Sequence, residues 1–425
     1  MTDPAACCPT IRTSASPSIR WRLASGVLAV GLLLAGCSDD ASQRSVDRST
    51  SSTDGVTSTT TAARAEVDVL EADDPGFYKV PDPLPTGRHG DLVRIQPVAG
   101  APAGTTWQRI MYLSETPAGE PTVVTGVITL PQGAPPDGGW PLFAHAHGST
   151  GIADDCAPSV SLGGDGTEAV EVKLLSIWVP QRRIAVVSTD YEGLGGPGRH
   201  PMLVGVSEGR SVLDSIEAAR QVPGAVFEDR VGVIGYSQGG HAAAWANQIA
   251  PEWAPDLDIV GVLAGAPATE LFDLFDQGDA AALSFVSALT AADPDLDPST
   301  ALTSAGLEAL AALDRSCDAP LEQAGPLTKV DVRTTEPWVS AIRANEPGSS
   351  PGVAPVLIVH SKEDESVPVA GSEAFQSRVC KAGGIVERRV LDEGTHVGAA
   401  IPAYRQGIDW ILGLEAGAQP VSTCP

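Results

Sequence analysis

Positively charged residues are scarce in this chain of 425 residues, which has 27 Lys and Arg against 53 Asp and Glu. The formal net charge is -26 at pH 7. A surface this acidic repels phosphate backbones, so we expect no nucleic-acid partner. Paired CxxC motifs are also missing, which argues against a zinc site of that kind. The chain is long enough for one large α/β domain or two ordinary ones, and hydrophobic residues make up 43% of it, so a sizeable core can be buried.

The N-terminus has the pattern of an export signal. Three arginines precede the apolar stretch at residues 23–36, which is too short to span a bilayer comfortably. The stretch runs into the sequence LAGC at residues 34–37, which resembles a bacterial lipobox. An ordinary secretion signal with a chance cysteine is the alternative. We predict a lipoprotein signal peptide over residues 1–36 and lipidation of Cys37.

A Ser/Thr-rich segment follows, with almost no large apolar residue. Such a composition cannot bury enough surface to order itself. We predict a tether over residues 37–68 that holds a folded domain, residues 69–425, off the membrane. The expected location is the bacterial cell envelope, anchored to the outer side of the cytoplasmic membrane through Cys37, or the medium after release.

Four cysteines remain outside the predicted signal and lipid site. They are Cys156, Cys317, Cys380 and Cys424. An even number in an oxidising compartment favours two disulfides, with free buried thiols as the alternative. Their spacing alone leaves three pairings open. We expect neither a metal nor a cofactor.

From about residue 105, segments of strand and helix character alternate. Strand composition is found at residues 106–114, 121–131, 140–148, 184–191, 230–236, 259–265, 354–361 and 385–391. Helical spacing is found at residues 211–220 and 241–250. This alternation predicts an α/β fold with a mostly parallel, doubly wound sheet. Residues 268 to about 350 contain no convincing strand, and we expect a helical cap over an active site there.

Two pentapeptides match the G-x-S-x-G pattern of serine hydrolases, at residues 205–209 and 235–239. A nucleophile of this kind needs a strand before it, a helix after it and small neighbours. Ser237 has the apolar run VGVI before it and HAAAWAN after it. Ser207 has no such strand, and we expect it near a helix N-terminus, where serine is a preferred cap. Ser237 is therefore the predicted nucleophile.

On this fold the acid and the histidine follow the serine in that order. His396 comes directly after the last predicted strand, and we predict it as the base, in a loop. His360 closes a strand and is expected to be structural, while His241 is expected to face away from the serine. Asp364 is the predicted acid, with Glu363 and Glu365 as alternatives.

The oxyanion needs backbone donors as well. One comes from the residue after the nucleophile, Gln238, and the other from the loop after the third strand. In that loop, Gly148 permits close approach of the backbone. Ser149 is therefore the predicted donor, with Thr150 as its rival, and His147 is expected to shape the loop.

These motifs together resemble the secreted lipase family of α/β-hydrolases, which includes the fungal lipase A type. The residues that carry the resemblance are AHAHGSTGIADDCAPS, DYEGLGGPGRHPMLVGVSEGRSVLDSIEAAR, GYSQGGHAAAWA, HSKEDESVPV and DEGTHVGA. The resemblance covers roughly residues 75–420. It implies ester hydrolysis without a cofactor, often of acylglycerols, and a helical cap before the acid strand. It also implies disulfides from Cys156 to Cys317 and from Cys380 to Cys424.

The expected activity is that of a lipase or carboxylesterase on lipid esters. An esterase for short-chain or polymer esters is the alternative, a serine peptidase or amidase is less favoured, and a binding protein with a dead fold is least favoured. Apolar residues of the cap could line an acyl tunnel or pack the cap onto the sheet, and packing is favoured. They are Leu271, Phe272, Leu274, Phe275, Leu283, Phe285 and Val286.

Overall fold

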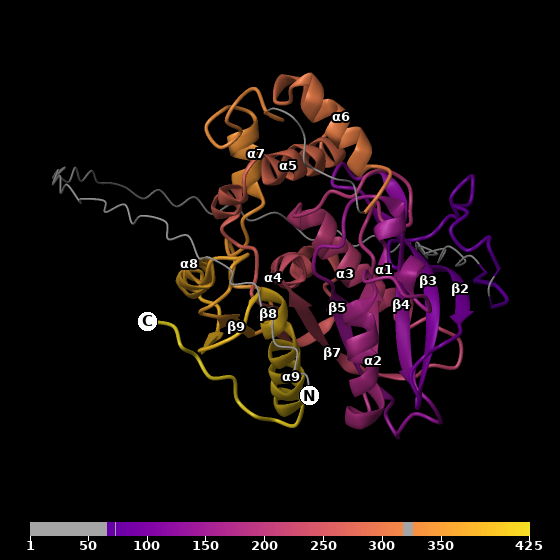
Figure 1. Ribbon diagram of the computed structural model, residues 1–425. Helices are drawn as coiled ribbons and strands as arrows, with labels where there is room; N and C mark the ends of the chain where they lie inside the picture. The colour runs from indigo at the N-terminus through magenta and orange to yellow at the C-terminus, as the bar shows by residue number, and fades with distance from the viewer. Residues whose placement is uncertain (1–65, 73, 318–325) are drawn as a thin grey trace, which may run out of the picture. The chain divides into compact units, whose positions relative to one another are not determined.

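The computed structural model describes residues 66–72, 74–317 and 326–425 (Figure 1). The predicted signal peptide, Cys37 and residues 37–65 of the predicted tether lie outside the described residues. Within the described part of the chain, no helix is both long enough and apolar enough to cross a membrane.

A single sheet runs through the described residues, with the strand order β1-β2-β3-β4-β6-β5-β7-β8-β9-β10. Six consecutive strands, from β6 to β10 in this order, are parallel to one another. β2, β3, β4 and β6 are joined by antiparallel pairings. The strands are β1 (Asp68–Val69), β2 (Leu92–Val98), β3 (Thr105–Glu115), β4 (Pro121–Pro131), β5 (Trp140–Ala146), β6 (Ala185–Thr189), β7 (Phe227–Tyr236), β8 (Asp258–Gly265), β9 (Val356–Ser361) and β10 (Val386–Leu391). The sheet is thus mostly parallel, as predicted.

Helices cover both faces of the sheet. On one face α3 (Gly205–Ala219), α4 (Gln238–Trp253) and α8 (Val369–Lys381) pack into one hydrophobic cluster with the strands. On the other face α2 (Val170–Arg182) and α9 (His396–Glu415) form a second cluster. The short η1 (Asp154–Cys156) and α1 (Pro158–Ser161) follow β5. The central strands are buried on both faces, which explains their continuous apolar runs.

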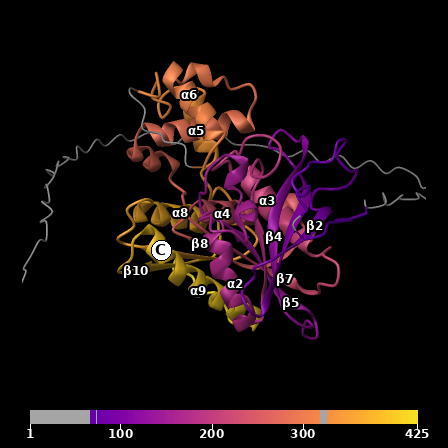
Figure 2. The ribbon, with the colours of Figure 1, turned by 45° about the vertical axis from the view of Figure 1, so that its right-hand side comes forward.

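The remaining helices all lie between β8 and β9 in the chain. They are η2 (Leu271–Gln277), α5 (Asp279–Ala292), η3 (Pro298–Thr300), α6 (Ser304–Leu313) and α7 (Trp338–Ala344). They bury a hydrophobic cluster of their own, separate from the two that cover the sheet. Figure 2 shows α5 and α6 together, set apart from the helices that flank the strands. We refer to residues 268–350 as the cap segment.

Two disulfides tie distant parts of the described chain together. Cys156, at the end of η1, is bonded to Cys317, which follows α6 in the cap segment. Cys380 in α8 is bonded to Cys424 near the C-terminus. These are the pairings that the family resemblance implies. The first bridge fixes the cap segment to the loop region after β5, where the predicted oxyanion residue Ser149 also lies.

Candidate active site

The turn between β7 and α4 holds Ser237 in a strained backbone conformation. Its φ is 58° and its ψ is -121°, in a region that residues with a side chain rarely adopt. Such strain costs on the order of 1–3 kcal/mol and is concentrated at functional sites. The strand before this serine and the helix after it are those that the sequence predicts.

Three glycines make this turn possible because side chains at their positions would collide with backbone atoms. A Cβ on Gly235 would lie 2.0 Å from the carbonyl oxygen of Gly239. A Cβ on Gly239 would lie 1.9 Å from the oxygen of Ala146, and one on Gly240 would lie 2.6 Å from the oxygen of Gly265. The helix can therefore start directly against the strands β5 and β8.

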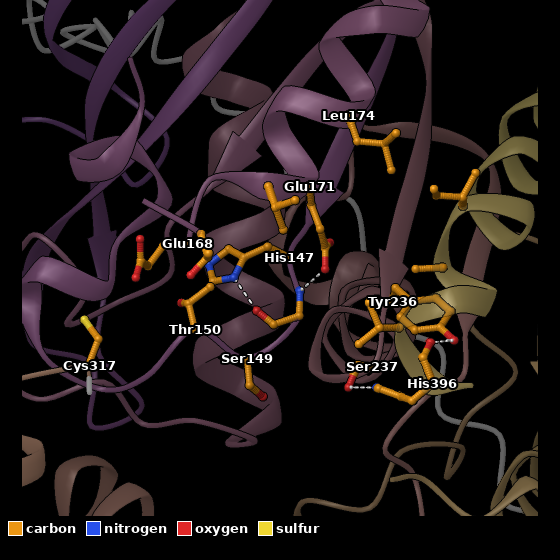
Figure 3. A pocket seen from close by; sticks show the side chains of 16 residues that line it. His147, Ser149, Thr150, Glu168, Glu171, Leu174, Tyr236, Ser237, Cys317 and His396 are labelled. Atoms are coloured by element: carbon orange, nitrogen blue, oxygen red, sulfur yellow. Dashed lines mark hydrogen bonds between the residues drawn. The ribbon is translucent and has the colours of Figure 1, made fainter. Parts of the chain in front are cut away.

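Ser237, His396 and Asp364 form one chain of hydrogen-bonding contacts (Figure 3). The Nε2 of His396 lies 3.0 Å from the Oγ of Ser237. Its Nδ1 lies 2.7 Å from the Oδ2 of Asp364. These distances suit a neutral imidazole that accepts from the serine hydroxyl and donates to the carboxylate. His396 is the first residue of α9, so the expectation that it lies in a loop is wrong.

Asp364 is surrounded by donors. Its Oδ1 accepts the backbone N–H groups of Ser366 and Val367, at 3.0 and 2.7 Å. The Nε2 of His360 lies 3.2 Å from its Oδ2. Burial raises the pKa of Asp364, but hydrogen bonds from His360, His396 and Val367 outweigh it and hold the pKa well below its usual range. The carboxylate is therefore ionised wherever the histidine is neutral.

The two alternative acids bind the backbone instead of the imidazole. The Oε2 of Glu363 accepts the N–H of Gly394 at 3.2 Å. The Oε2 of Glu365 accepts the backbone N–H of His396 at 2.9 Å. Both contacts fasten the loop that leads into α9, so these glutamates orient the predicted base, His396, through the backbone.

The predicted oxyanion residues stand beside the serine. Gln238 is the first residue of α4, and Ser149 lines the same small cavity as Ser237 and His396. The side chain of Gln238 is turned inward, where its Nε2 donates to the Oε1 of Glu208 at 2.8 Å. The rival Thr150 lines the larger cavity described below, and its buried Oγ1 has no hydrogen-bond partner among the described residues.

Ser207 is placed quite differently. It is buried as the third residue of α3, and its hydroxyl donates to the carboxylate of Glu192. Ser207 thus lies near a helix N-terminus, as expected, but the N-cap residue of α3 is Val204. Gly205 is needed for packing, because a Cβ there would lie 1.9 Å from the ring of Trp245. The pentapeptide at residues 205–209 thus lies in a buried helix start, where Ser207 contacts a carboxylate instead of an imidazole.

The other histidines with predicted roles lie where they were expected. His241 is buried, with Nδ1 2.6 Å from the Oε2 of Glu208 and Nε2 2.8 Å from the oxygen of Asn345. His147 lies with its Nδ1 2.6 Å from the oxygen of Gly148, a contact that shapes the loop before Ser149. In the described part of the chain, no group of three or more His, Cys, Asp or Glu is arranged to hold a metal.

Glu171 is a site residue that the sequence reasoning missed. Its Oε1 accepts the N–H of Gly148 at 3.2 Å, and its other oxygen accepts from the hydroxyl of Tyr404 and lies 3.1 Å from the Nε2 of His145. One carboxylate on α2 therefore links the loop before Ser149 to α9, the helix that starts at His396. A single glutamate at a helix start matches no motif, so nothing in the sequence marks it.

Two cavities meet at Ser237. The larger, of about 540 Å³, reaches from the loop at Gly148 to α2 and α9 (Figure 3). The smaller, of about 180 Å³, lies toward the cap segment and is lined by residues that include Leu274 and Phe285. Ser149, Ser237 and His396 line both. An ester carbonyl at Ser237 could therefore extend one part of the molecule into each cavity.

Comparisons with known proteins find similarity to lipases. The family model described as secretory lipase matches residues 166–317. Lipase A of Moesziomyces aphidis is 29% identical over 239 residues, which cover 53% of this chain and 50% of that protein. A Mycobacterium tuberculosis protein named a probable inactive lipase is 29% identical over 235 residues, which cover 53% and 52%. The chain thus spans about half the length of these relatives.

The structure of Candida antarctica lipase A in its closed state is similar to this one. The TM-score is 0.72 at 24% identity, over 83% of this chain and 88% of that chain. At this level of identity the likeness speaks to the fold.

The buried contact between Ser207 and Glu192 can be tested through the pKa of Glu192. Burial raises its pKa to about 7, although the Ser207 hydroxyl and Arg210 favour the ionised form. The folded state therefore holds an extra proton between about pH 4.5 and 7, and the protein loses stability as the pH rises through that window. From pH 5 to pH 8 the wild type should lose about 1–3 kcal/mol of unfolding free energy through this group. Glu192→Gln should not show this loss, so its stability relative to wild type should rise by that amount.

Urea denaturation of both proteins at the two pH values measures this gain. Glu252→Gln, at an exposed position of α4, controls for the removal of a negative charge. The same stability difference between Glu192→Gln and wild type at both pH values would contradict the argument.

The motifs, the sheet and these matches together confirm the predicted resemblance: the chain has the α/β-hydrolase fold and is similar in sequence to the secretory lipases.

Proposed function

We propose that this protein is a serine carboxylic ester hydrolase of the lipase type, with Ser237 as nucleophile, His396 as base and Asp364 as orienting acid. The observation that carries the proposal is the continuous contact from the Oγ of Ser237 through the imidazole to the carboxylate. One relative is named a probable inactive lipase, so kinship alone does not decide activity. The proposal rests on the intact geometry in this chain.

The reaction is acyl transfer to water. His396 takes the proton of the Ser237 hydroxyl as the Oγ attacks the ester carbonyl, and the imidazolium then protonates the departing alcohol oxygen. A water molecule, deprotonated by the same imidazole, hydrolyses the acyl-enzyme and restores the serine. Asp364 fixes the tautomer of the imidazole and stabilises its protonated form throughout.

Two backbone N–H groups stabilise the oxyanion in this proposal. The N–H of Gln238 belongs to the first residue of α4, where the helix dipole favours negative charge. The N–H of Ser149 comes from the loop that Glu171 holds through Gly148. Preorganised donors of this kind each contribute about 10²–10³ in rate.

Lipid esters are the proposed substrates. The names of the family and of its relatives point to lipases, and the larger cavity at Ser237 falls in the size range of small-molecule sites. The acidic surface favours uncharged substrates over anionic ones.

The proposed site of action is the outer side of the cytoplasmic membrane. The secretory character of the family supports export, and the LAGC sequence at residues 34–37 supports an anchor on Cys37. Cells grown with labelled palmitate should label the wild-type protein and not Cys37→Ser. Equal label in both would remove the anchor from the account.

Ester hydrolysis by Ser237→Ala tests the proposed mechanism. The nucleophile is lost, so we expect the rate to fall by about 10⁴-fold or more on any ester that the wild type hydrolyses. A panel of p-nitrophenyl and glycerol esters provides the measurement.

Ser207→Ala is the matched control. It removes a serine from the other pentapeptide and should retain activity within a few-fold of wild type in the folded protein. Parent-level hydrolysis by Ser237→Ala would overturn the assignment, as would a loss confined to Ser207→Ala.

A further inference from the structure

The larger cavity at Ser237 has an apolar end between two helices. On α2 it is lined by Val170 and Leu174, and on α9 by Val397, Ala400 and Ile401. We call these five residues the α2–α9 groove. In Figure 3 Leu174 and Tyr236 lie on the side of Ser149 toward His396, whereas Thr150, Glu168 and Cys317 lie on the opposite side. Leu174 is thus drawn on the side of the cavity where Ser237 and His396 lie.

The groove has two apolar rows that face it from different helices. On α2, Val170 and Leu174 are four residues apart, a spacing that places them on one helix face. On α9, Val397, Ala400 and Ile401 have the same kind of spacing. The ion pair between Arg182 and Asp409, at 2.8 Å, joins α2 to α9 further along both helices. Both walls therefore belong to regular helices that are held together.

Three of the five apolar side chains of the α2–α9 groove are exposed to solvent. The exposed fraction is 60% for Val170, 79% for Val397 and 51% for Ile401. Single exposed apolar residues are common on protein surfaces and need no explanation. Here three of them line the same cavity as Ser237 and His396, so a bound apolar group would cover them and stand next to the reacting atoms.

The cap segment offers less room. Of the seven cap residues that the sequence suggests for an acyl tunnel, only Leu274 and Phe285 line the smaller cavity. All seven belong to or pack against the cap segment's own hydrophobic cluster, and the rings of Phe275 and Phe285 stack with centroids 4.8 Å apart. Most of these side chains therefore pack inside the cap segment. Packing is the favoured alternative of the sequence analysis, but it occurs within the cap and not, as expected there, onto the sheet.

We propose that the α2–α9 groove binds a hydrocarbon chain of the ester substrate. The inference rests on the proposed ester hydrolysis and adds the place where a chain is recognised. Each methylene group that the groove removes from water should improve kcat/KM by about fourfold until the groove is filled.

A charged chain end is disfavoured in this groove. Glu171 lies in the same cavity, and although burial raises its pKa, hydrogen bonds and charge from His145 lower it overall. The carboxylate is therefore ionised and repels an anionic head group or a free fatty-acid carboxylate. The groove thus suits the uncharged chain of an intact ester.

The chain can come from either half of the ester, because both cavities meet at Ser237. Two substrate series separate these sources. In the first, methyl esters of acids from C4 to C16 vary the acyl chain alone. In the second, acetates of alcohols from C2 to C14 vary the alcohol chain alone. The series whose chain-length dependence responds to a groove variant identifies the half that binds there.

Leu174→Trp fills the groove, and Ile401→Trp does so from the opposite wall in case the first variant fails to fold. We expect kcat/KM for the long members of one series to fall at least tenfold, with methyl butyrate and ethyl acetate hydrolysed within about twofold of wild type. Leu307→Trp, at an exposed position of α6, is the matched control and should leave both series unchanged. Leu274→Trp reports on the cap cavity.

Three outcomes would overturn the proposal. The first is that both groove variants keep the wild-type chain-length dependence in both series. The second is that only Leu274→Trp changes this dependence, and the third is that wild-type kcat/KM does not rise with chain length in either series. Failure of the proposed function is distinguishable from all three, because the wild type would then hydrolyse no member of either series, including methyl butyrate and ethyl acetate.

Discussion

The active site depends on one backbone turn, the left-handed conformation of Ser237 between β7 and α4. This turn is strained, and it persists because Gly235, Gly239 and Gly240 let the helix approach the strands more closely than any side chain would permit. The serine hydroxyl is thereby lifted to the sheet edge, and the N–H of Gln238 stands beside it at the helix start. The proposed nucleophile and the proposed oxyanion donor are products of the same constraint.

The rest of the site is brought to this turn by elements far apart in the chain. Asp364 follows β9 and His396 follows β10, two neighbouring parallel strands whose ends meet at one sheet edge. Glu363 and Glu365 hold the loop between β10 and α9 through backbone N–H groups. Glu171 connects the loop at Gly148 to Tyr404 of α9. A substrate groove between α2 and α9 would therefore be built from the same elements that align the catalytic groups.

The sequence predicts the mostly parallel sheet, because a strand, a glycine-rich turn and a helix have strong local patterns. It also indicates Ser237, Asp364 and His396, which are in contact in the structure. Other features are hidden for physical reasons. β2 contains Pro97, a residue that argues against a strand. α9 contains Pro402, which obscures the helix that Thr395 begins as its N-cap. Glu171 acts through contacts with distant segments, which no local pattern records.

The central claim is that the strained turn makes Ser237, and no other serine, an activated nucleophile. It is tested most directly by reaction with a p-nitrophenyl alkylphosphonate, which transfers its phosphonyl group to an activated serine hydroxyl and releases p-nitrophenolate. Peptide mapping by mass spectrometry should find one phosphonyl group per chain, on Ser237. Modification of Ser207, or the absence of any modified serine in the folded protein, would contradict the account.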